Sequence, residues 1–290
     1  MTPTVYIVVG PTAVGKTKYA IALAQKLQTE IISADARQCY QELNIGVARP
    51  SLEELATVPH HFIASHSIQE TVNAGTFEAY AMAKSAELLA QFGSVVMVGG
   101  TGLYIKAFVE GLDQIPAIDP ALRSQIQEDV SNKGMDWLQA QVQAKDPAYW
   151  VQADQGEQQN TQRLSRALEV VIGTGQSILS FQLQSKKTRS FKIQKIGMEL
   201  PREQLYDRIN QRVMQMFDMG LEAEVNALRP QFHLNALQTV GYQEWLPYFE
   251  GHQTKEAVVH AIQQNTRHYA KRQMTWFKKD AEISWNQTSK

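Results

Sequence analysis

Short apolar, β-branched runs alternate with amphipathic stretches over the first hundred residues. The runs at Val5–Val9, Glu30–Ala34 and Ser94–Val98 are typical of parallel strands buried on both faces. The stretches 18–27 and 76–92 carry apolar residues three and four positions apart, which indicates helices. This alternation predicts an α/β fold in which helices flank a parallel sheet.

The pattern changes after Gly111. Residues 119–182 show helical periodicity and few β-branched runs, which predicts a helical insertion. Polar and apolar residues alternate again at Phe191–Leu200, as in a strand, and Pro201–Met219 has the apolar spacing of a helix. We therefore expect three segments: a first part of the core over 1–115, a helical insertion over 116–185, and a second part with a basic C-terminal helix over 186–290.

The amino-acid composition indicates the class of protein. With 43% apolar and 20% charged residues, the chain has the make-up of a soluble globular protein. It carries no apolar stretch of membrane-spanning length and no signal-peptide pattern, so we expect a cytoplasmic protein without a membrane segment. The single Cys39 excludes an internal disulfide framework and a cysteine-based zinc site.

Charge is uneven although its sum is only −1. Residues 255–279 hold one acid, Glu256, against six basic residues, interleaved with the aromatics Tyr269, Trp276 and Phe277. Basic side chains bind nucleic-acid backbones and aromatics stack on splayed bases, so this stretch indicates a polyanionic partner. The alternative is a core helix whose basic side is only solvated. The six basic residues are Lys255, Arg267, Lys271, Arg272, Lys278 and Lys279.

The turn after the first strand carries the clearest chemical pattern. Its eight residues match the P-loop at every fixed position: Gly10, Pro11, Thr12, Ala13, Val14, Gly15, Lys16 and Thr17. The two glycines let successive N–H groups point at one anion, and the following helix adds its positive end. A lysine and a threonine in this place supply a mobile charge and a ligand for Mg²⁺. The sequence therefore predicts a P-loop NTPase-like core that binds a diphosphate or triphosphate.

Two further strand ends carry candidate site residues. Asp35 follows the second strand, where ligands of parallel sheets bind, although an aspartate here can equally cap a helix. Gly99 and Gly100 follow the third strand, where many P-loop ATPases have a magnesium-binding aspartate. Glycines in place of this aspartate count against a standard ATPase. They instead favour close approach of a ligand to the backbone, with Thr101 as a hydroxyl contact.

Two pairs of arginines at helical spacing remain open to two interpretations. Arg208 and Arg212 lie four apart and can clamp phosphate oxygens or pair with acids. Arg163 and Arg166 lie three apart, and on spacing alone a solvated face is favoured over a ligand contact. The pair His60 and His61 lacks a third ligand at a recognisable spacing, which favours a structural role.

Taken together, these segments resemble the bacterial tRNA dimethylallyltransferase (tRNA isopentenyltransferase) family. The matching stretches follow the family's order over nearly the full length: 10–17, 32–40, 98–104, 162–169, 240–242 and 271–276. The resemblance implies transfer of a dimethylallyl group from its diphosphate to N6 of the adenine 3′ of the anticodon in tRNA. It implies Mg²⁺ as cofactor and tRNA and dimethylallyl diphosphate as partners. No obligate protein partner is evident, and we expect a monomer.

The resemblance also implies residue roles. Asp35 is the general base on N6, and Lys16, Thr17 and Arg212 handle the diphosphate and its metal, with Thr17 as metal ligand and Arg212 and Thr101 among the catalytic residues. The helical insertion is expected to embrace the anticodon stem. The expected tRNA contacts are Asp35, Ala36, Arg37, Gln38, Thr101, Arg123, Gln162, Arg163, Leu164, Ser165, Arg166, Gln238, Thr239, Val240, Gly241, Tyr242, Gln243, Lys271, Arg272, Gln273, Trp276 and Lys278.

The chain departs from the family pattern at three positions near Asp35. Ala36 stands where serine is common, and Val47 and Arg49 stand where threonine and lysine are usual. Two other functions compete: an adenylate isopentenyltransferase acting on AMP, ADP or ATP, and a P-loop kinase or ATPase. The helical insertion and the basic C-terminal stretch disfavour the first, because a free nucleotide needs neither. The glycines at 99 and 100 disfavour the second.

Overall fold

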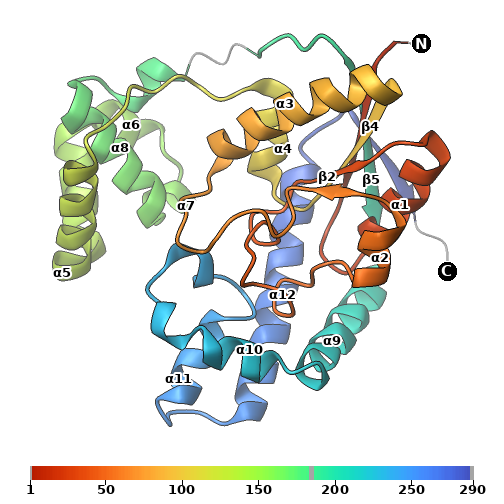
Figure 1. Cartoon of the computed structure of the whole chain (residues 1–290). Helices are drawn as coiled ribbons and strands as arrows, with labels where there is room; N and C mark the ends of the chain where they lie inside the picture. The colour runs from red at the N-terminus through yellow and green to blue at the C-terminus, as the bar shows by residue number, and fades with distance from the viewer. Residues whose placement is uncertain (1, 183–185, 288–290) are drawn as a thin grey trace. The chain divides into compact units, whose positions relative to one another are not determined.

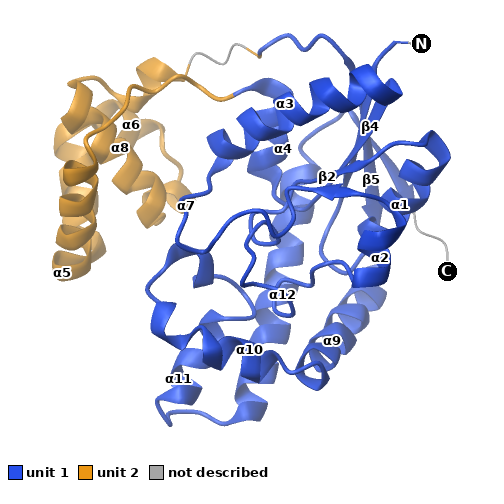
Figure 2. Cartoon of the chain, viewed as in Figure 1, with its two compact units in different colours: residues 1–111, 187–290 blue, residues 112–186 orange. Residues whose placement is uncertain are grey.

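A computed structural model describes residues 2–182 and 186–287 (Figure 1). The chain forms two compact units, coloured separately in Figure 2. Unit 1 joins the N-terminal residues up to Gly111 to those from Lys187 onward, and unit 2 is the segment 112–186 between them.

Unit 1 contains a parallel sheet, as the strand pattern predicts. Its strand order is β3-β2-β4-β1-β5-β6, so β1 lies inside the sheet between β4 and β5. The last strand, at one edge, was not predicted. The six strands of the described chain are β1 (Thr4–Val9), β2 (Ile31–Ser33), β3 (His60–His61), β4 (Ser94–Val98), β5 (Lys192–Glu199) and β6 (Ile283–Gln287).

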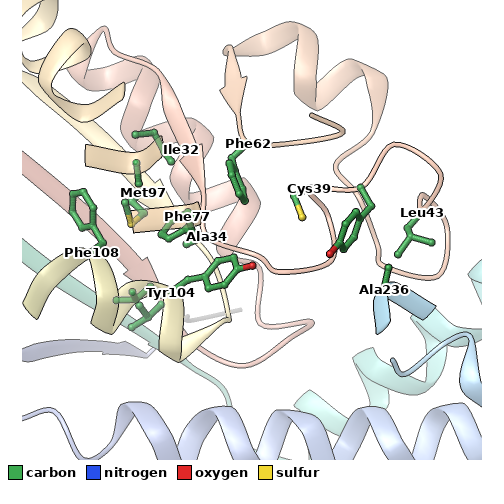
Figure 3. Close-up of a cluster of buried hydrophobic side chains, with 14 of the residues drawn as sticks. Ile32, Ala34, Cys39, Leu43, Phe62, Phe77, Met97, Tyr104, Phe108 and Ala236 are labelled. Carbon is green, nitrogen blue, oxygen red and sulfur yellow. The ribbon is translucent and has the colours of Figure 1, made fainter. Parts of the chain in front are cut away.

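Both faces of the central strands are covered, which is why these strands are almost continuously apolar. Ile7 and Met97 belong to one buried cluster with side chains of α3 and α4, part of which Figure 3 shows. Val8, which follows Ile7, and Val96, which precedes Met97, belong to the opposite cluster with side chains of α1 and α9. Neighbouring residues of a strand therefore pack into different layers, and the sheet is held rigidly between them.

The helices of unit 1 agree with the predicted amphipathic stretches, and the predicted basic C-terminal helix is present. The glycine turn at 238–243 leads into a short 3₁₀ turn and a one-turn helix. The basic stretch forms a helix with one buried side, which includes Ala270 and Phe277. The helices are α1 (Lys16–Leu27), α2 (Leu52–Thr57), α3 (Ala74–Phe92), α4 (Gly102–Glu110), α9 (Arg202–Asp218), α10 (Leu221–Ala227), α11 (Leu246–Phe249) and α12 (Lys255–Phe277), with 3₁₀ turns η2 (Arg229–Gln231), η3 (Asn235–Leu237) and η4 (Gln243–Trp245).

Unit 2 is helical, which confirms the helical character predicted for 119–182. It has its own apolar core, to which Leu138, Val142 and Leu168 contribute. Its elements are α5 (Pro120–Lys145), kinked at Gly134, α6 (Pro147–Gln152), α7 (Gln155–Gln158), α8 (Thr161–Thr174) and η1 (Ile178–Phe181). Among the residues that the structure describes, the helices are too short or too polar to cross a membrane.

Candidate active site

The turn after β1 has the backbone of an anion cradle. Gly10 and Gly15 have φ values of 148° and 100°, and Ala13 between them has 65°. A side chain at Gly10 is excluded, because its Cβ would lie 2.5 Å from the Met198 carbonyl oxygen. Gly15 precedes α1 without a side-chain cap, so the first N–H groups of the helix remain open to a ligand. The N-terminus of α1 therefore fits a phosphate group.

Three cations surround this turn. Lys16 donates from Nζ to the Pro11 carbonyl oxygen at 2.8 Å. From α9, Arg212 donates to the Thr12 hydroxyl at 3.3 Å, and Arg208 donates to the Val14 carbonyl oxygen at 3.5 Å. The structure thus places both α9 arginines beside the P-loop, as the phosphate-clamp interpretation requires.

Burial and neighbouring charge affect these cations. Burial and the Arg212 guanidinium lower the pKa of Lys16 to about 8, and the Asp35 carboxylate opposes this shift. Burial also lowers the pKa of Arg212, and Glu54 opposes it. Positive groups held close together and partly away from water are costly without an anion, so this cluster favours binding of a polyanion.

Asp35 combines the two roles that the sequence leaves open. It lies two residues beyond the end of β2, and its Oδ1 accepts from the N–H groups of Arg37 at 2.9 Å and Gln38 at 3.2 Å. This oxygen caps the turn. Within the described chain, Oδ2 makes no hydrogen bond, and the influence of Asp35 on Lys16 places it near the P-loop. One carboxylate oxygen therefore holds the loop while the other is available as a base.

The turn between β4 and α4 contributes the third side of the site. Thr101 accepts from the N–H of Ala36 at 3.0 Å and so joins this turn to the Asp35 loop. The backbone excludes a side chain at Gly99, and a side chain at Gly100 would displace the amide of Gln273. A Cβ on Gly99 would lie 2.1 Å from the Ala34 carbonyl oxygen, and one on Gly100 would lie 2.1 Å from Gln273 Nε2. The place where an ATPase has its magnesium-binding aspartate therefore has no room for one.

Gln273 lies between the P-loop and the turn after β4. We expected it among the tRNA contacts, but its side chain is buried on the inner side of α12. Its Oε1 accepts from the Thr12 N–H at 2.8 Å, and its Nε2 donates to the Gly100 carbonyl oxygen at 3.0 Å. The sequence does carry a signal: Gln273 falls between Ala270 and Phe277 on the buried stripe of the helix. A polar residue in such a register indicates a buried hydrogen-bond partner.

Few side chains among the described residues could bind a magnesium ion at this site. Among the described residues there is no group of three or more histidine, cysteine, aspartate or glutamate side chains that could hold a metal ion. Thr17 is the second residue of α1 and lies beside the anion cradle. These residues fit an ion that is held chiefly by phosphate oxygens and water, with one hydroxyl from the protein, which is a common arrangement for Mg²⁺.

Comparison with known proteins decides the family. The model of the IPP transferase family matches residues 38–280. A tRNA dimethylallyltransferase of Christiangramia forsetii is 47% identical over 278 residues, which cover 96% of this chain and 91% of that protein. One of Cytophaga hutchinsonii is 41% identical over 281 residues, which cover 97% and 91%. The chain belongs to the tRNA dimethylallyltransferase family.

Solved structures agree with this assignment. The tRNA isopentenylpyrophosphate transferase of Bacillus halodurans superposes with a TM-score of 0.71 at 33% identity, covering 98% of this chain and 90% of that one. A eukaryotic dimethylallyltransferase, described as acting on tRNA, has a TM-score of 0.80 at 22% identity and covers 99% and 74%. The second comparison shows the same fold.

On α12, some of the residues that the dimethylallyltransferase pattern assigns to tRNA are exposed. A pocket of about 390 Å³ is lined by His268, Lys271, Arg272, Thr275, Trp276 and Lys279. Trp276 also packs against the start of α4, because a Cβ on Gly102 would lie 2.2 Å from its Nε1. Lys278 is differently placed: it pairs with Glu199 at 2.6 Å and lies 3.9 Å over the Trp285 ring.

The segment 238–243, predicted to contact tRNA, contains both exposed and buried residues. Gln238 and Gln243 are exposed, Thr239 and Val240 are half-buried, and Gly241 is buried. The side chain of Tyr242 is fully buried, and its hydroxyl donates to Glu224 Oε1 at 2.6 Å. A side chain so placed supports the loop from inside, and the tRNA contact predicted for Tyr242 stays a prediction.

The loop after Asp35 is held by side chains that the motif analysis did not single out for this role. Glu224 accepts from the N–H groups of Ile45 at 2.8 Å and Gly46 at 3.0 Å. Arg49, one of the departures from the family pattern, donates to the Tyr40, Gln41 and Leu43 carbonyl oxygens. Gln38 donates to the carbonyl oxygens of Val47 at 3.2 Å and Ala48 at 3.0 Å. The Arg49 side chain therefore stabilises the loop by binding the loop's backbone carbonyl oxygens.

In unit 2 the predicted contacts divide into exposed and buried residues. Arg123 and Arg166 both donate to Oε2 of the buried Glu169, each at 3.1 Å. Arg163 pairs with Glu157. Gln162 is exposed and Ser165 is half-buried. Leu164 is fully buried in the core of the unit, and the tRNA contact predicted for it stays a prediction.

Proposed function

We propose that this chain transfers the dimethylallyl group from dimethylallyl diphosphate to the exocyclic N6 amine of the adenine 3′ of the anticodon in tRNA. The observation that carries the proposal is the convergence of an anion cradle, an available carboxylate oxygen on Asp35 and the Thr101 hydroxyl at the carboxyl ends of β1, β2 and β4. Membership of the tRNA dimethylallyltransferase family supports it.

On the donor side, the bond between C1 of the dimethylallyl group and the diphosphate oxygen breaks. The leaving diphosphate gains negative charge, and neutralising that charge lowers the barrier. Lys16 and Arg212 are positioned for this task, since each contacts the P-loop, at Pro11 and Thr12. The open N–H groups at the start of α1 add to the same stabilisation.

On the acceptor side, a bond forms between N6 and C1 while N6 loses a proton. An aromatic amine is a weak nucleophile, so a base that accepts its proton in the transition state helps the attack. Asp35 Oδ2 is suited to this role, because Oδ1 is already bound to the N–H groups of Arg37 and Gln38 and holds the carboxylate in place. The adenine leaves its stack to reach this site.

A magnesium ion, when bound, supplies further charge neutralisation at the diphosphate oxygens. Thr17 would hold it together with the substrate oxygens. The chain's own part is to place Thr17 at the start of α1, adjacent to Lys16.

For tRNA we propose the exposed basic residues of α12 as a contact for the phosphate backbone. Lys271 and Arg272 line the same pocket, and neither has an ion-pair partner among the described residues. Arg123 and Arg166 in unit 2 are a second candidate contact, since their shared partner Glu169 fixes both guanidiniums. A guanidinium that is already held in place loses less conformational entropy when it binds a phosphate oxygen.

The test is transfer of radiolabel. Labelled dimethylallyl diphosphate is incubated with the protein and Mg²⁺ in three reactions: with unmodified tRNA, with AMP, and without an acceptor. We expect label in the tRNA alone. Label in AMP would favour the adenylate isopentenyltransferase instead. Nucleotide hydrolysis or phosphate transfer with no prenyl product would favour a kinase or ATPase.

A further inference from the structure

We propose that Gln273 is a positioning residue that fixes the P-loop against the turn between β4 and α4, and thereby sets the geometry of the donor diphosphate site. The inference rests on the proposed prenyl transfer for its substrate. It assigns to an α12 residue a role on the donor side of the reaction, although the same helix carries the candidate tRNA contacts on its outer side.

The amide of Gln273 bridges the P-loop and the turn after β4. Within the described chain, no backbone hydrogen bond joins Thr12 to Gly100. Its oxygen accepts from Thr12 N at 2.8 Å and its nitrogen donates to Gly100 O at 3.0 Å. Thr12 is 261 residues away along the chain and Gly100 is 173 residues away. The side chain is 5% exposed, so water does not compete readily for either bond.

The two bonds act on residues that lie next to the reactive groups. Thr12 is held on both sides, because its hydroxyl accepts from Arg212 while its N–H donates to Gln273. Gly100 precedes Thr101, which in turn binds the Asp35 loop through Ala36. A Cβ on Gly100 would lie 3.8 Å from Lys16 Nζ, so the ammonium is also at this junction. A shift of one loop against the other would therefore change the distance between diphosphate and base.

A glutamine can also be buried merely to fill space, and the two roles differ in what they require. Positioning needs an acceptor facing Thr12 and a donor facing Gly100. Space filling needs only the volume. Gln273→Met keeps most of the volume and removes both bonds. Gln273→Glu keeps the shape and the acceptor, but an ionised carboxylate has no donor for Gly100, whereas a protonated one does.

The experiment measures kcat and KM for dimethylallyl diphosphate with saturating tRNA, from pH 6 to pH 8.5, together with the affinity for inorganic diphosphate and for tRNA. Because displacements of about 1 Å at a reacting centre cost up to about a hundredfold in rate, we expect Gln273→Met to lower kcat/KM by about ten- to a hundredfold. Its affinity for inorganic diphosphate should fall, and its tRNA affinity should stay within about threefold of wild type. For Gln273→Glu, the activity relative to wild type should rise as the pH falls.

Gln263→Glu is the matched control, because Gln263 lies on the same helix, is partly buried and donates to the Asn210 carbonyl oxygen at 3.4 Å, with no hydrogen bond to the P-loop within the described chain. We expect wild-type donor kinetics and no pH-dependent ratio for it. Thermal unfolding of all variants shows that they are folded at the assay temperature.

Donor kinetics of Gln273→Met within about threefold of wild type would overturn the positioning role. So would an equal, pH-independent loss in both Gln273 variants, since volume or polarity alone would then explain it. If wild type binds inorganic diphosphate but transfers no prenyl group to tRNA, the proposed function fails separately, and the effect of Gln273→Met on diphosphate affinity still decides the inference. If the wild-type protein does not bind diphosphate, both the proposed function and the positioning role of Gln273 are contradicted.

Discussion

Binding of the prenyl donor should depend on the protonation of Lys16. Burial, assisted by the Arg212 guanidinium, lowers the pKa of this lysine to about 8 in the free protein, against opposition from Asp35. A diphosphate beside the ammonium favours the charged form, so the pKa of Lys16 rises when the donor binds. The donor affinity is therefore nearly full at pH 7, one unit below the pKa of the free protein, and is lost as the pH rises through that pKa.

The size of the effect follows from the charged fraction. With a pKa of about 8, Lys16 is roughly nine-tenths charged at pH 7 and about one-tenth charged at pH 9. The donor affinity should therefore fall about tenfold between these two values. Two other groups change little in this range: the last proton of a phosphate leaves near pH 6, and burial raises the pKa of Cys39 to about 12.

Calorimetric titration with dimethylallyl diphosphate and Mg²⁺ across this range measures the effect, with Lys16→Arg as the control. An arginine keeps its charge throughout, so this variant should bind more weakly but with a nearly flat profile. A wild-type profile as flat as that of the arginine variant would refute the reasoning. It would show that Lys16 is fully charged in the free protein or does not meet the diphosphate.

Three variants test the other assignments. Asp35→Ala should slow single-turnover transfer by about 10²–10⁴-fold with tRNA affinity roughly intact, and rates within about threefold of wild type would remove Asp35 as the base. Arg212→Ala should lower kcat/KM for the donor and spare tRNA binding, and the reverse pattern would contradict its placement at the diphosphate. Replacing Lys271 and Arg272 together with alanine should make the slope of log K for tRNA against log salt shallower by about one to two, and an unchanged slope would leave the outer side of α12 as a solvated surface.

The parts of the site that sequence analysis predicts are those built from local chain. The P-loop needs only a strand end, two glycines and a helix start, and all lie within residues 5–17. The position of Asp35 follows in the same way, since the carboxyl ends of parallel strands meet at one edge. Its double role as cap and candidate base needs the structure, because the spacing alone supports either.

Residues that act across long separations were harder to predict. Gln273 reaches Thr12 and Gly100 only because α12 packs against both loops, and a motif pattern cannot distinguish it from its exposed neighbour Arg272. Tyr242 was assigned to the tRNA surface, yet it fits beneath Gly46 with its hydroxyl on Glu224. The edge strand β6 is short, and Trp285 and Ile283 within it pack on Gly197 of β5. Tertiary contacts decided each of these three.

The most direct test of the central claim is the mass of the nucleosides in tRNA after incubation with the protein, dimethylallyl diphosphate and Mg²⁺. The account predicts one added dimethylallyl group on the adenosine 3′ of the anticodon, and none in a tRNA that carries guanosine at that position. It also predicts that the Asp35→Ala protein leaves the adenosine unmodified on the time scale of the wild-type reaction. Two results would contradict this prediction. One is an unmodified adenosine when related tRNA dimethylallyltransferases, assayed in parallel, do modify it. The other is a dimethylallyl group on another nucleoside.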